Sequence, residues 1–177
     1  MRRTGLGAVV VVGLLLAGQQ AALAHDWTRD DTCGTSTYDA YFYPMGRASD
    51  WYAPSNSAAI GGCYMYTNAQ TGGSMEAAIW YLPTDANFNH TYQVRVHIPS
   101  NWGCTGNPVR YERWANGTAG GVTSNHTLNQ NGVASPAWRT IMTQSFTATS
   151  GGYVKMVDNT GITTQKVCAD QLRYITQ

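Results

Sequence analysis

The chain has 177 residues, 43% of them hydrophobic and 12% charged, a composition that suits one globular domain with a sizeable core. Its 11 basic and 10 acidic side chains give a formal net charge of +1 at pH 7, and no basic stripe or polybasic run is present. These properties argue against nucleic acid and anionic membranes as partners, and they leave both enzymes and binding modules open.

Residues 1–24 are predicted to be a secretory signal peptide. Met1-Arg2-Arg3 precedes an apolar run from Leu6 to Ala17, and Ala22-Leu23-Ala24 follows it. A basic start, a short hydrophobic middle and a small-residue cleavage site are the features of such a peptide. The run is too short to span a bilayer comfortably. We therefore expect cleavage before His25 and a secreted, extracellular protein with no later membrane insertion; the twin-arginine-like start is typical of bacteria.

The cysteines are Cys33, Cys63, Cys104 and Cys168, and none of them forms a C-x-x-C motif. An even number of cysteines in an oxidising compartment favours disulfide bonds over zinc or redox sites. Three pairings are possible. We favour Cys33–Cys168 with Cys63–Cys104, because the first bond would tie the N-terminal arm to the last strand.

Residues 25–45 are predicted to form an N-terminal arm and a first strand, and residues 46–177 a β-sandwich domain. The arm is polar and irregular over 25–36, and the strand covers 37–43. A short strand follows over 61–67. Residues 74–82 could form a helix or a strand, but Gly73 and Pro83 leave too little length for a stable helix. This segment predicts a strand buried on both faces.

Thr91 to Ile98 is the clearest strand. Its apolar residues alternate strictly with Gln93, Arg95 and His97, a pattern that places one face on the core and the other in water. Exposure to solvent would explain His97. Further strands are predicted over 109–114 and 122–130, with turns at 116–117 and 120–121.

The last forty residues predict three strands, the last of them over 167–175, with turns at 149–152 and 158–161. Trp138, Val154, Met156 and Leu172 are expected to be packing residues. Asp170 is expected to be a structural acid that accepts hydrogen bonds from a loop or pairs with an arginine, because burying a bare carboxylate is costly. The spacing of strands and turns along the whole chain predicts an all-β, antiparallel, jelly-roll-like β-sandwich stapled by disulfides.

Five segments follow one another in a distinctive order: His90-Thr91-Tyr92-Gln93-Val94, Asn129-Gln130, Trp138 with Ile141, Gly152 to Asn159, and Ala169-Asp170-Gln171-Leu172-Arg173. In this order they resemble the golvesin C-terminal-like domain, also called the xanthan-lyase carbohydrate-binding-like domain. Met142 stands where that family has glycine, and Gln171 where a small residue is usual. The resemblance implies a non-catalytic β-sandwich module of the kind found on secreted or cell-surface proteins and on polysaccharide-degrading enzymes.

Carbohydrate is the ligand that the aromatic residues favour. The chain has 6 Trp and 11 Tyr but only 3 Phe, and Trp and Tyr suit surfaces that are half apolar and half wet. Sugars stack their C–H faces on such rings and hydrogen-bond to amides and charged groups. The candidate ligand-binding residues are Trp102, Trp114, Trp51, Tyr52, Asn101 and Arg113. An extracellular polysaccharide is the expected partner.

Two other classes stay open: a protein-binding structural or adhesive surface module, and a small glycan-active hydrolase. No G-x-S-x-G motif is present, and the histidines lack metal-binding spacing. Asp158-Asn159 reads as a turn rather than a metal site, because calcium needs several converging oxygens. We therefore expect no enzyme, no cofactor and no metal; the sequence does not determine the oligomeric state.

Overall fold

The fold is an antiparallel β-sandwich, described here by a computed structural model for residues 26–29, 42–73, 76–82, 90–100, 103–118, 120–131, 136–146 and 151–177. One sheet has five strands, in the order β2 (Phe42–Met45), β4 (Ala77–Tyr81), β9 (Tyr153–Val157), β6 (Val109–Thr118) and β7 (Ser124–Leu128). The second has four, in the order β1 (Asp26–Arg29), β11 (Leu172–Thr176), β5 (Thr91–Ile98) and β8 (Ala137–Ser145).

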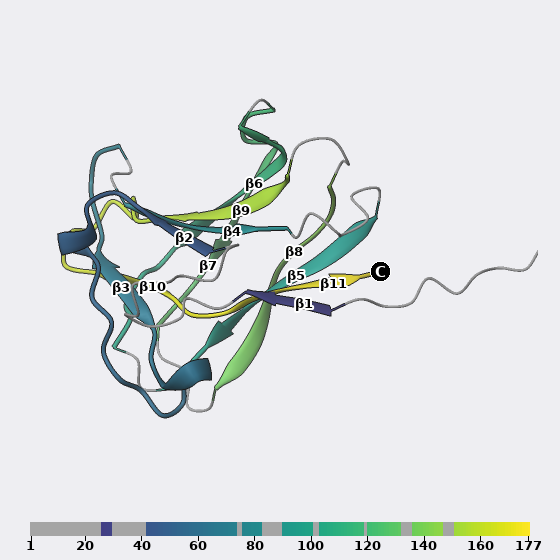
Figure 1. The fold of residues 1–177 in the computed structure, drawn as a ribbon. Helices are drawn as coiled ribbons and strands as arrows, with labels where there is room; N and C mark the ends of the chain where they lie inside the picture. Colours follow the sequence, from purple (N-terminus) through teal and green to yellow (C-terminus); the bar gives the residue numbers. More distant parts are fainter. Residues whose placement is uncertain are drawn as a thin grey trace, which may run out of the picture.

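A small two-stranded sheet of β3 (Met65–Asn68) and β10 (Lys166–Ala169) completes the sandwich at one end. Figure 1 shows the two larger sheets facing each other, with β3 and β10 at the left and the C-terminus at the right. Two short 3-10 helices, η1 (Ala48–Asp50) and η2 (Ile60–Gly62), lie in the connection before β3. The part of the chain that the structure describes contains no helix long and apolar enough to cross a membrane.

Two strand predictions are confirmed closely. β5 has the predicted bounds, and its apolar residues Tyr92, Val94 and Val96 are buried on the side that faces the other sheet. β4 forms the predicted strand over part of 74–82, and it is buried on both faces, since Ala77 to Trp80 alternate between the two faces and all four are buried. The helix alternative for this segment is therefore excluded.

The core between the sheets is aromatic. Tyr92, Phe146 and Tyr174 meet edge to face, with ring centroids 5.8–6.2 Å apart. The Tyr174 hydroxyl donates a 2.6 Å hydrogen bond to the Trp80 carbonyl and so links the two sheets. Burial of these large side chains contributes to the driving force for folding. The predicted packing roles of Val154, Met156 and Leu172 are confirmed, since all three are fully buried.

Three predictions of secondary structure were wrong. The expected single strand over 167–175 is two strands in different sheets, because the chain turns at Asp170 and Gln171 to bury the Asp170 carboxylate. β6 runs on through the expected turn at 116–117, with Gly117 at a φ of 62°. Residues 26–29 of the expected irregular arm pair with β11. Most of the predicted strand over 37–43 lies outside the described residues, and β2 begins at Phe42.

The expected disulfide pairing was also wrong. Cys104 is bonded to Cys168, with Cα atoms 5.9 Å apart. Cys63 is disulfide-bonded as well, and Cys33 lies outside the described residues. The Cys104–Cys168 bond excludes both Cys33–Cys168 and Cys63–Cys104. The physical reason is that the segment after Cys104 runs along β10, where the Thr105 and Gly106 N–H groups donate to the Lys166 carbonyl.

Candidate functional site

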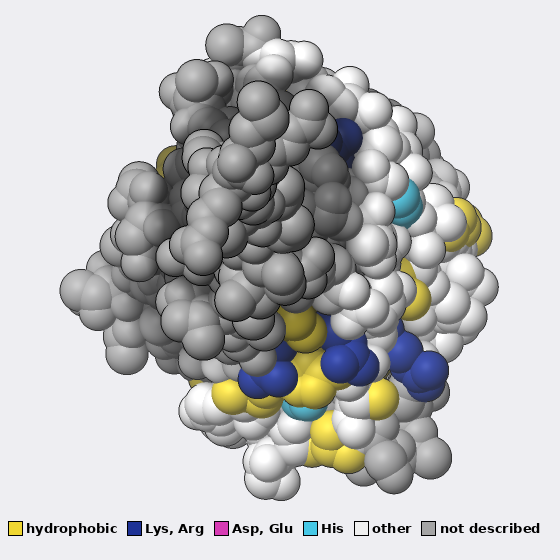
Figure 2. Space-filling view, turned by 90° about the vertical axis from the view of Figure 1, so that its right-hand side faces the viewer, with side chains coloured by type: hydrophobic (Ala, Val, Ile, Leu, Met, Phe, Trp, Pro, Cys, Tyr) yellow, Lys and Arg dark blue, Asp and Glu magenta, His cyan; other side chains and the backbone are white. Residues whose placement is uncertain are grey.

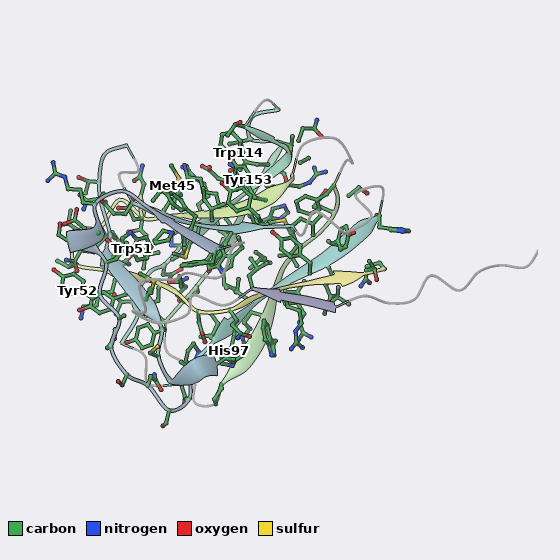
Figure 3. The ribbon with its side chains drawn as sticks, in the orientation of Figure 1. Met45, Trp51, Tyr52, His97, Trp114 and Tyr153 are labelled. Carbon is green, nitrogen blue, oxygen red and sulfur yellow. A yellow bond between two sulfur atoms is a disulfide. The ribbon has the colours of Figure 1, made fainter. Side chains whose placement is uncertain are left out.

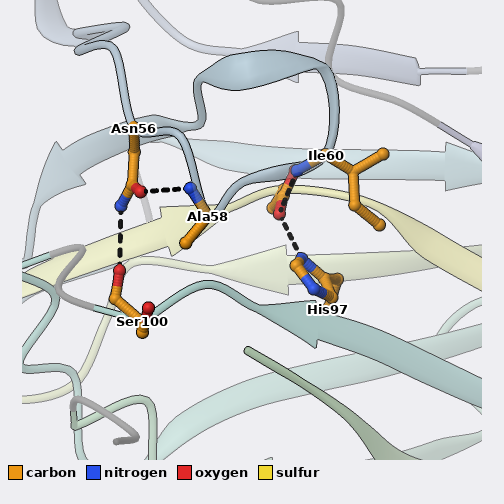
Figure 4. A network of polar contacts seen from close by, with 6 residues as sticks. Asn56, Ala58, Ile60, His97 and Ser100 are labelled. Carbon is orange, nitrogen blue, oxygen red and sulfur yellow. Dashed lines mark hydrogen bonds and ion pairs between the residues drawn. The ribbon is translucent and has the colours of Figure 1, made fainter. Parts of the chain in front are cut away.

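A buried acid fixes the loop that precedes β3. The Asp170 carboxylate oxygen Oδ2 lies 2.6 Å from His97 Nδ1 and accepts a 3.4 Å hydrogen bond from the Ile60 N–H (Figure 4). Asn56 extends the network, since its Nδ2 donates to the Ser100 carbonyl at 3.0 Å. Asp170 is buried and accepts a hydrogen bond from a loop backbone, as expected, with a histidine rather than an arginine as a side-chain partner.

His97 is not the solvated residue that the alternation of β5 predicted. It is 7% exposed, and its ring centroid lies 5.3 Å from that of Trp138. Trp138 in turn is half-buried on the outer face of the four-stranded sheet, so it is not the core residue that we expected. Both departures arise because residues of β8 and the corner at Asp170 cover part of this outer face.

The loop held by Asp170 begins with an exposed aromatic residue. Tyr52 and Tyr66 exchange two backbone hydrogen bonds of 2.9 and 2.8 Å, which fix Tyr52 alongside β3. Their rings stack with centroids 5.0 Å apart and an interplanar angle of 18°. Tyr52 is 47% exposed. A flat aromatic surface therefore faces outward at the end of the sandwich.

A cation borders this surface. The Lys166 ammonium group lies 4.6 Å from the centroid of the Tyr66 ring, within the range of a cation–π interaction. Next to Lys166, the Gln165 side chain accepts from the Asn107 N–H at 3.2 Å and donates to the Asn107 carbonyl at 3.4 Å. We call Tyr52, Tyr66 and Lys166 the tyrosine platform. An exposed ring beside a cation can stack on one part of a ligand while the cation hydrogen-bonds to another.

The strand that carries Lys166 is held from two sides. The Cys104–Cys168 disulfide ties it to the 103–107 segment. The buried Gln130 side chain donates to the Cys168 carbonyl at 2.8 Å and accepts from the Cys168 N–H at 2.9 Å, so it acts as a strand partner for β10. Gln130 also donates to the Tyr111 hydroxyl at 2.8 Å. These buried contacts fix the backbone of β10, and with it the position of Lys166.

The predicted site residues do not form one group. Trp51 is only 9% exposed, and its Nε1 donates to the Met45 carbonyl at 2.9 Å, so this indole supports the loop rather than presenting a face. In Figure 3, Trp51 and Tyr52 lie at the left of the molecule and Trp114 lies at the top, away from them. Trp102 and Asn101 lie outside the described residues.

Trp114 belongs to a second aromatic group, on the outer face of the five-stranded sheet. Its ring stacks on Tyr153 with centroids 5.3 Å apart, and its Nε1 donates to the Glu112 carboxylate at 3.2 Å. Tyr153 is only 3% exposed, and burial, with smaller effects of Tyr81 and Glu112, raises its pKa to about 12. This group is therefore much less accessible than Tyr52.

Arg113, the last of the six predicted ligand-binding residues, lies on the core-facing side of β6, opposite to Trp114. It pairs in register with the fully buried Val154, and its guanidinium carbon lies 5.3 Å from the centroid of the Phe146 ring. Burial lowers the pKa of Arg113. Arg113 and Trp114 thus occupy opposite faces of β6, as neighbours in a strand do.

Carboxyl groups meet at another place, between the start of β4 and the end of β9. Burial raises the pKa of Glu76 to about 7, and hydrogen bonding and charge from Asp158 and Asp50 act in the same direction. Glu76 and Asp158 are both buried. Within the described ranges, no three or more His, Cys, Asp or Glu side chains are arranged to hold a metal ion.

Sequence reasoning missed Tyr66 and Lys166. Tyr64 and Tyr66 alternate with Met65 and Thr67 in a predicted strand, and this pattern could have singled out one aromatic face. Lys166 gave no comparable signal, because only the pairing of β3 with β10 brings it to Tyr66.

No protein-family model matches the sequence, and no curated protein matches it significantly. Among solved structures, the fold is similar to part of a xanthan lyase from Paenibacillus, with a TM-score of 0.63 and 20% identity. The match covers 86% of this chain but only 13% of the lyase chain. At this identity the similarity shows a shared β-sandwich fold.

Two smaller proteins also align over most of this chain. They are the CBM36-1 domain of a multidomain xylanase from the hindgut metagenome of Trinervitermes trinervoides and the C-terminal CBM6 of the laminarinase LamC from Zobellia galactanivorans. Both have a TM-score of 0.48, with 14% and 12% identity. The alignments cover 85% and 86% of this chain, and 96% and 100% of the two domains.

Proposed function

We propose that this protein is a secreted, non-catalytic module that binds carbohydrate through the tyrosine platform. The observation that carries the proposal is the Tyr52 ring, 47% exposed and stacked on Tyr66. Sugars offer apolar C–H faces to such a ring, and their hydroxyl groups take hydrogen bonds from neighbouring amides and cations. Within the platform, the Lys166 ammonium group can supply such a bond.

The platform suits binding because it is fixed before a ligand arrives. Backbone bonds to Tyr66, the Asp170 network and the Cys104–Cys168 disulfide hold its two sides. A preformed surface loses little conformational entropy when it binds, so more of the contact energy is available as affinity. The fold shared with part of a polysaccharide lyase is compatible with this role.

The described acidic side chains are mostly buried, and this placement favours a binding role over catalysis. A glycosidase needs two carboxyl groups that both reach the substrate. Glu76, Glu112, Asp158 and Asp170 are buried, and Asp50 is the remaining acid whose side chain is described. We therefore assign no catalytic residue. The golvesin-like family and the ligand roles of Trp102 and Asn101 stay predictions.

Affinity electrophoresis in gels that contain a neutral polysaccharide tests the proposal. Across a panel of β-glucans, xylans and mannans, the protein should be retarded by at least one, and Tyr52→Ala should weaken that retardation about tenfold, since one stacked ring contributes on the order of 1.5 kcal/mol. Tyr43→Ala is the matched control, because Tyr43 is also an exposed tyrosine, 55% accessible, but it lies on β2 in the five-stranded sheet and is not part of the platform. Equal retardation of the wild type and Tyr52→Ala would refute the platform.

The same control addresses the alternative of a protein-binding surface module. Tyr43 and Met45 are both exposed on β2, which is the edge strand of the five-stranded sheet. Exposed apolar residues on an open edge favour pairing with another chain. If Tyr43→Ala abolishes capture of a protein from the native secretome and free sugar does not compete, this alternative replaces the carbohydrate proposal.

A further inference from the structure

We propose that Arg113 and His126 form a binding site for an oxyanion group, a carboxylate or a sulfate, at the β7 edge of the five-stranded sheet. The site shares no residue with the tyrosine platform. Arg113 of β6 pairs in register with Ser124, and His126 lies two residues further along β7. Because His126 pairs with the core residue Tyr111, the Arg113 and His126 side chains both lie on the core-facing side of the sheet.

Three polar groups come together at this edge. Arg113 and His126 are diagonal neighbours on adjacent strands, a spacing of about 7–8 Å that a long side chain can bridge. The guanidinium carbon of Arg113 lies 5.3 Å from the centroid of the Phe146 ring, so an aromatic face holds this group in place. The Ser124 hydroxyl lies 3.3 Å from His126 Nε2. A guanidinium group, an imidazole and a hydroxyl can therefore reach one small ligand.

The Arg113 guanidinium group has no protein acceptor among the described residues. Its Nε is buried without a hydrogen bond to them, and within that part of the chain the group forms no ion pair. Burial lowers the pKa of Arg113, because these surroundings disfavour the charged form of the side chain. A cation taken out of water is costly unless hydrogen bonds and an opposite charge compensate it. A ligand oxyanion would supply both.

His126 is sensitive to the charge at this site. Burial lowers the pKa of His126, and the positive charge of Arg113 lowers it further. The neighbouring carboxylate Glu112 lies on the opposite face of β6, where it bonds to Trp114. The other titratable side chains described around Phe146 and His126 are His90, Tyr92, Tyr111 and Tyr174. An anion bound beside Arg113 would favour the protonated imidazole and so raise the pKa of His126.

The site lies near the end of the sandwich that carries the C-terminus. The Phe146 N–H donates to the carbonyl of His90, which directly precedes β5, and this end of β5 pairs with the end of the C-terminal strand β11. Figure 2 shows the molecule from this side, where Lys, Arg and His side chains are visible and no Asp or Glu of the described residues is. Arg113 and His126 are both half-buried. A small group can therefore reach them at a place where charges are screened less than on an exposed surface.

An NMR titration of His126 in the full, oxidised chain tests the site. The imidazole signal is followed from pH 5 to 8 with galacturonate, with inorganic sulfate and with neutral galactose, at an ionic strength fixed with sodium chloride. Galacturonate, sulfate or both should raise the pKa of His126 by about one pH unit, and galactose should not change it. By reciprocity, the anion that does so should bind about tenfold more tightly at pH 5 than at pH 8. The two anions distinguish a carboxylate site, which the planar guanidinium group can bind through two parallel N–H···O bonds, from a sulfate site.

Three variants make the test specific. R113Q, checked for folding by thermal melting, should lose the anion-dependent rise in the pKa of His126. R139Q is the matched control, because Arg139 is an exposed arginine that pairs with Val96, at the other end of β8 from Phe146, and it should keep the rise. H126Q should bind the anion, followed by backbone amide shifts, with an affinity that no longer depends on pH.

The proposal is overturned if neither anion changes the pKa of His126, or if a folded R113Q protein shows the same rise as the wild type. Loss of the rise in R139Q would assign it to the general charge of the protein and overturn the site as well. If R113Q does not fold, H126Q decides: anion affinity that still changes with pH as it does in the wild type contradicts the proposal.

Discussion

The Asp170 carboxylate shows how one residue connects the fold with the candidate site. It is buried where β10 ends and β11 begins, and it binds His97 of β5 and the backbone of Ile60. A buried carboxylate is tolerated only when hydrogen bonds replace its hydration. Its partners lie in the four-stranded sheet and in the loop that starts at Tyr52. Asp170 therefore stabilises the sandwich and the tyrosine platform together.

Replacing Asp170 by Asn should lower the free energy of unfolding by about 1–3 kcal/mol, the usual cost of losing a charged partner in a buried hydrogen bond. Urea denaturation followed by tryptophan fluorescence measures this change. Asp50→Asn is the control, because Asp50 is half-buried at the end of η1 and should have a much smaller effect. Similar losses for both variants would show that the Asp170 network contributes nothing particular.

Glu76 predicts a pH dependence of stability. Its pKa is raised from an ordinary 4.5 to about 7, chiefly by burial, so the folded protein binds a proton that the unfolded chain releases. Stability should therefore fall as the pH rises from about 5 to 7 and level off above that range. Glu76→Gln should flatten this part of the curve, with a difference on the order of 1–3 kcal/mol between the acidic and neutral ends. Parallel curves for the variant and the wild type would contradict this assignment.

At the level of strands, the disulfide is the covalent link between β10 and the rest of the sandwich. Cys104 and Cys168 are 64 residues apart in the sequence, so the bond closes a long loop in the unfolded chain. Cross-links of this kind stabilise mainly by restricting the unfolded state.

The double variant Cys104→Ala/Cys168→Ala should lower the free energy of unfolding by about 2–4 kcal/mol. The pairing of β10 should persist, because Gln130 still bonds the backbone of residue 168. Guanidinium unfolding of the variant and the wild type, both kept oxidised, measures the loss. An unchanged midpoint would mean that backbone and side-chain contacts alone hold this strand.

Local patterns explain which strands could be predicted. The alternation in β5 gave its bounds, and the flanking Gly73 and Pro83 identified β4 as a strand. The division at Asp170 was missed because a single acid inside an apolar run does not reveal a change of sheet. Disulfide pairing and the approach of Lys166 to Tyr66 depend on contacts between distant segments, which no local pattern contains. For the same reason Tyr52 could be proposed from the sequence, whereas its stacking partner could not.

For the whole molecule, the tyrosine platform lies at the end of the sandwich, beside β3 and β10. Loss of the platform should weaken binding to every glycan that the protein retains, because each of them would stack on the same ring.

The most direct test of carbohydrate binding is a glycan array probed with the oxidised wild-type protein, Tyr52→Ala and Tyr43→Ala at equal concentration. The account predicts that the wild type binds a defined set of glycans, that Tyr43→Ala retains this set, and that Tyr52→Ala loses it while melting at an unchanged temperature. If the wild type binds no glycan, or if Tyr52→Ala keeps the full set, the protein does not use the tyrosine platform to bind carbohydrate.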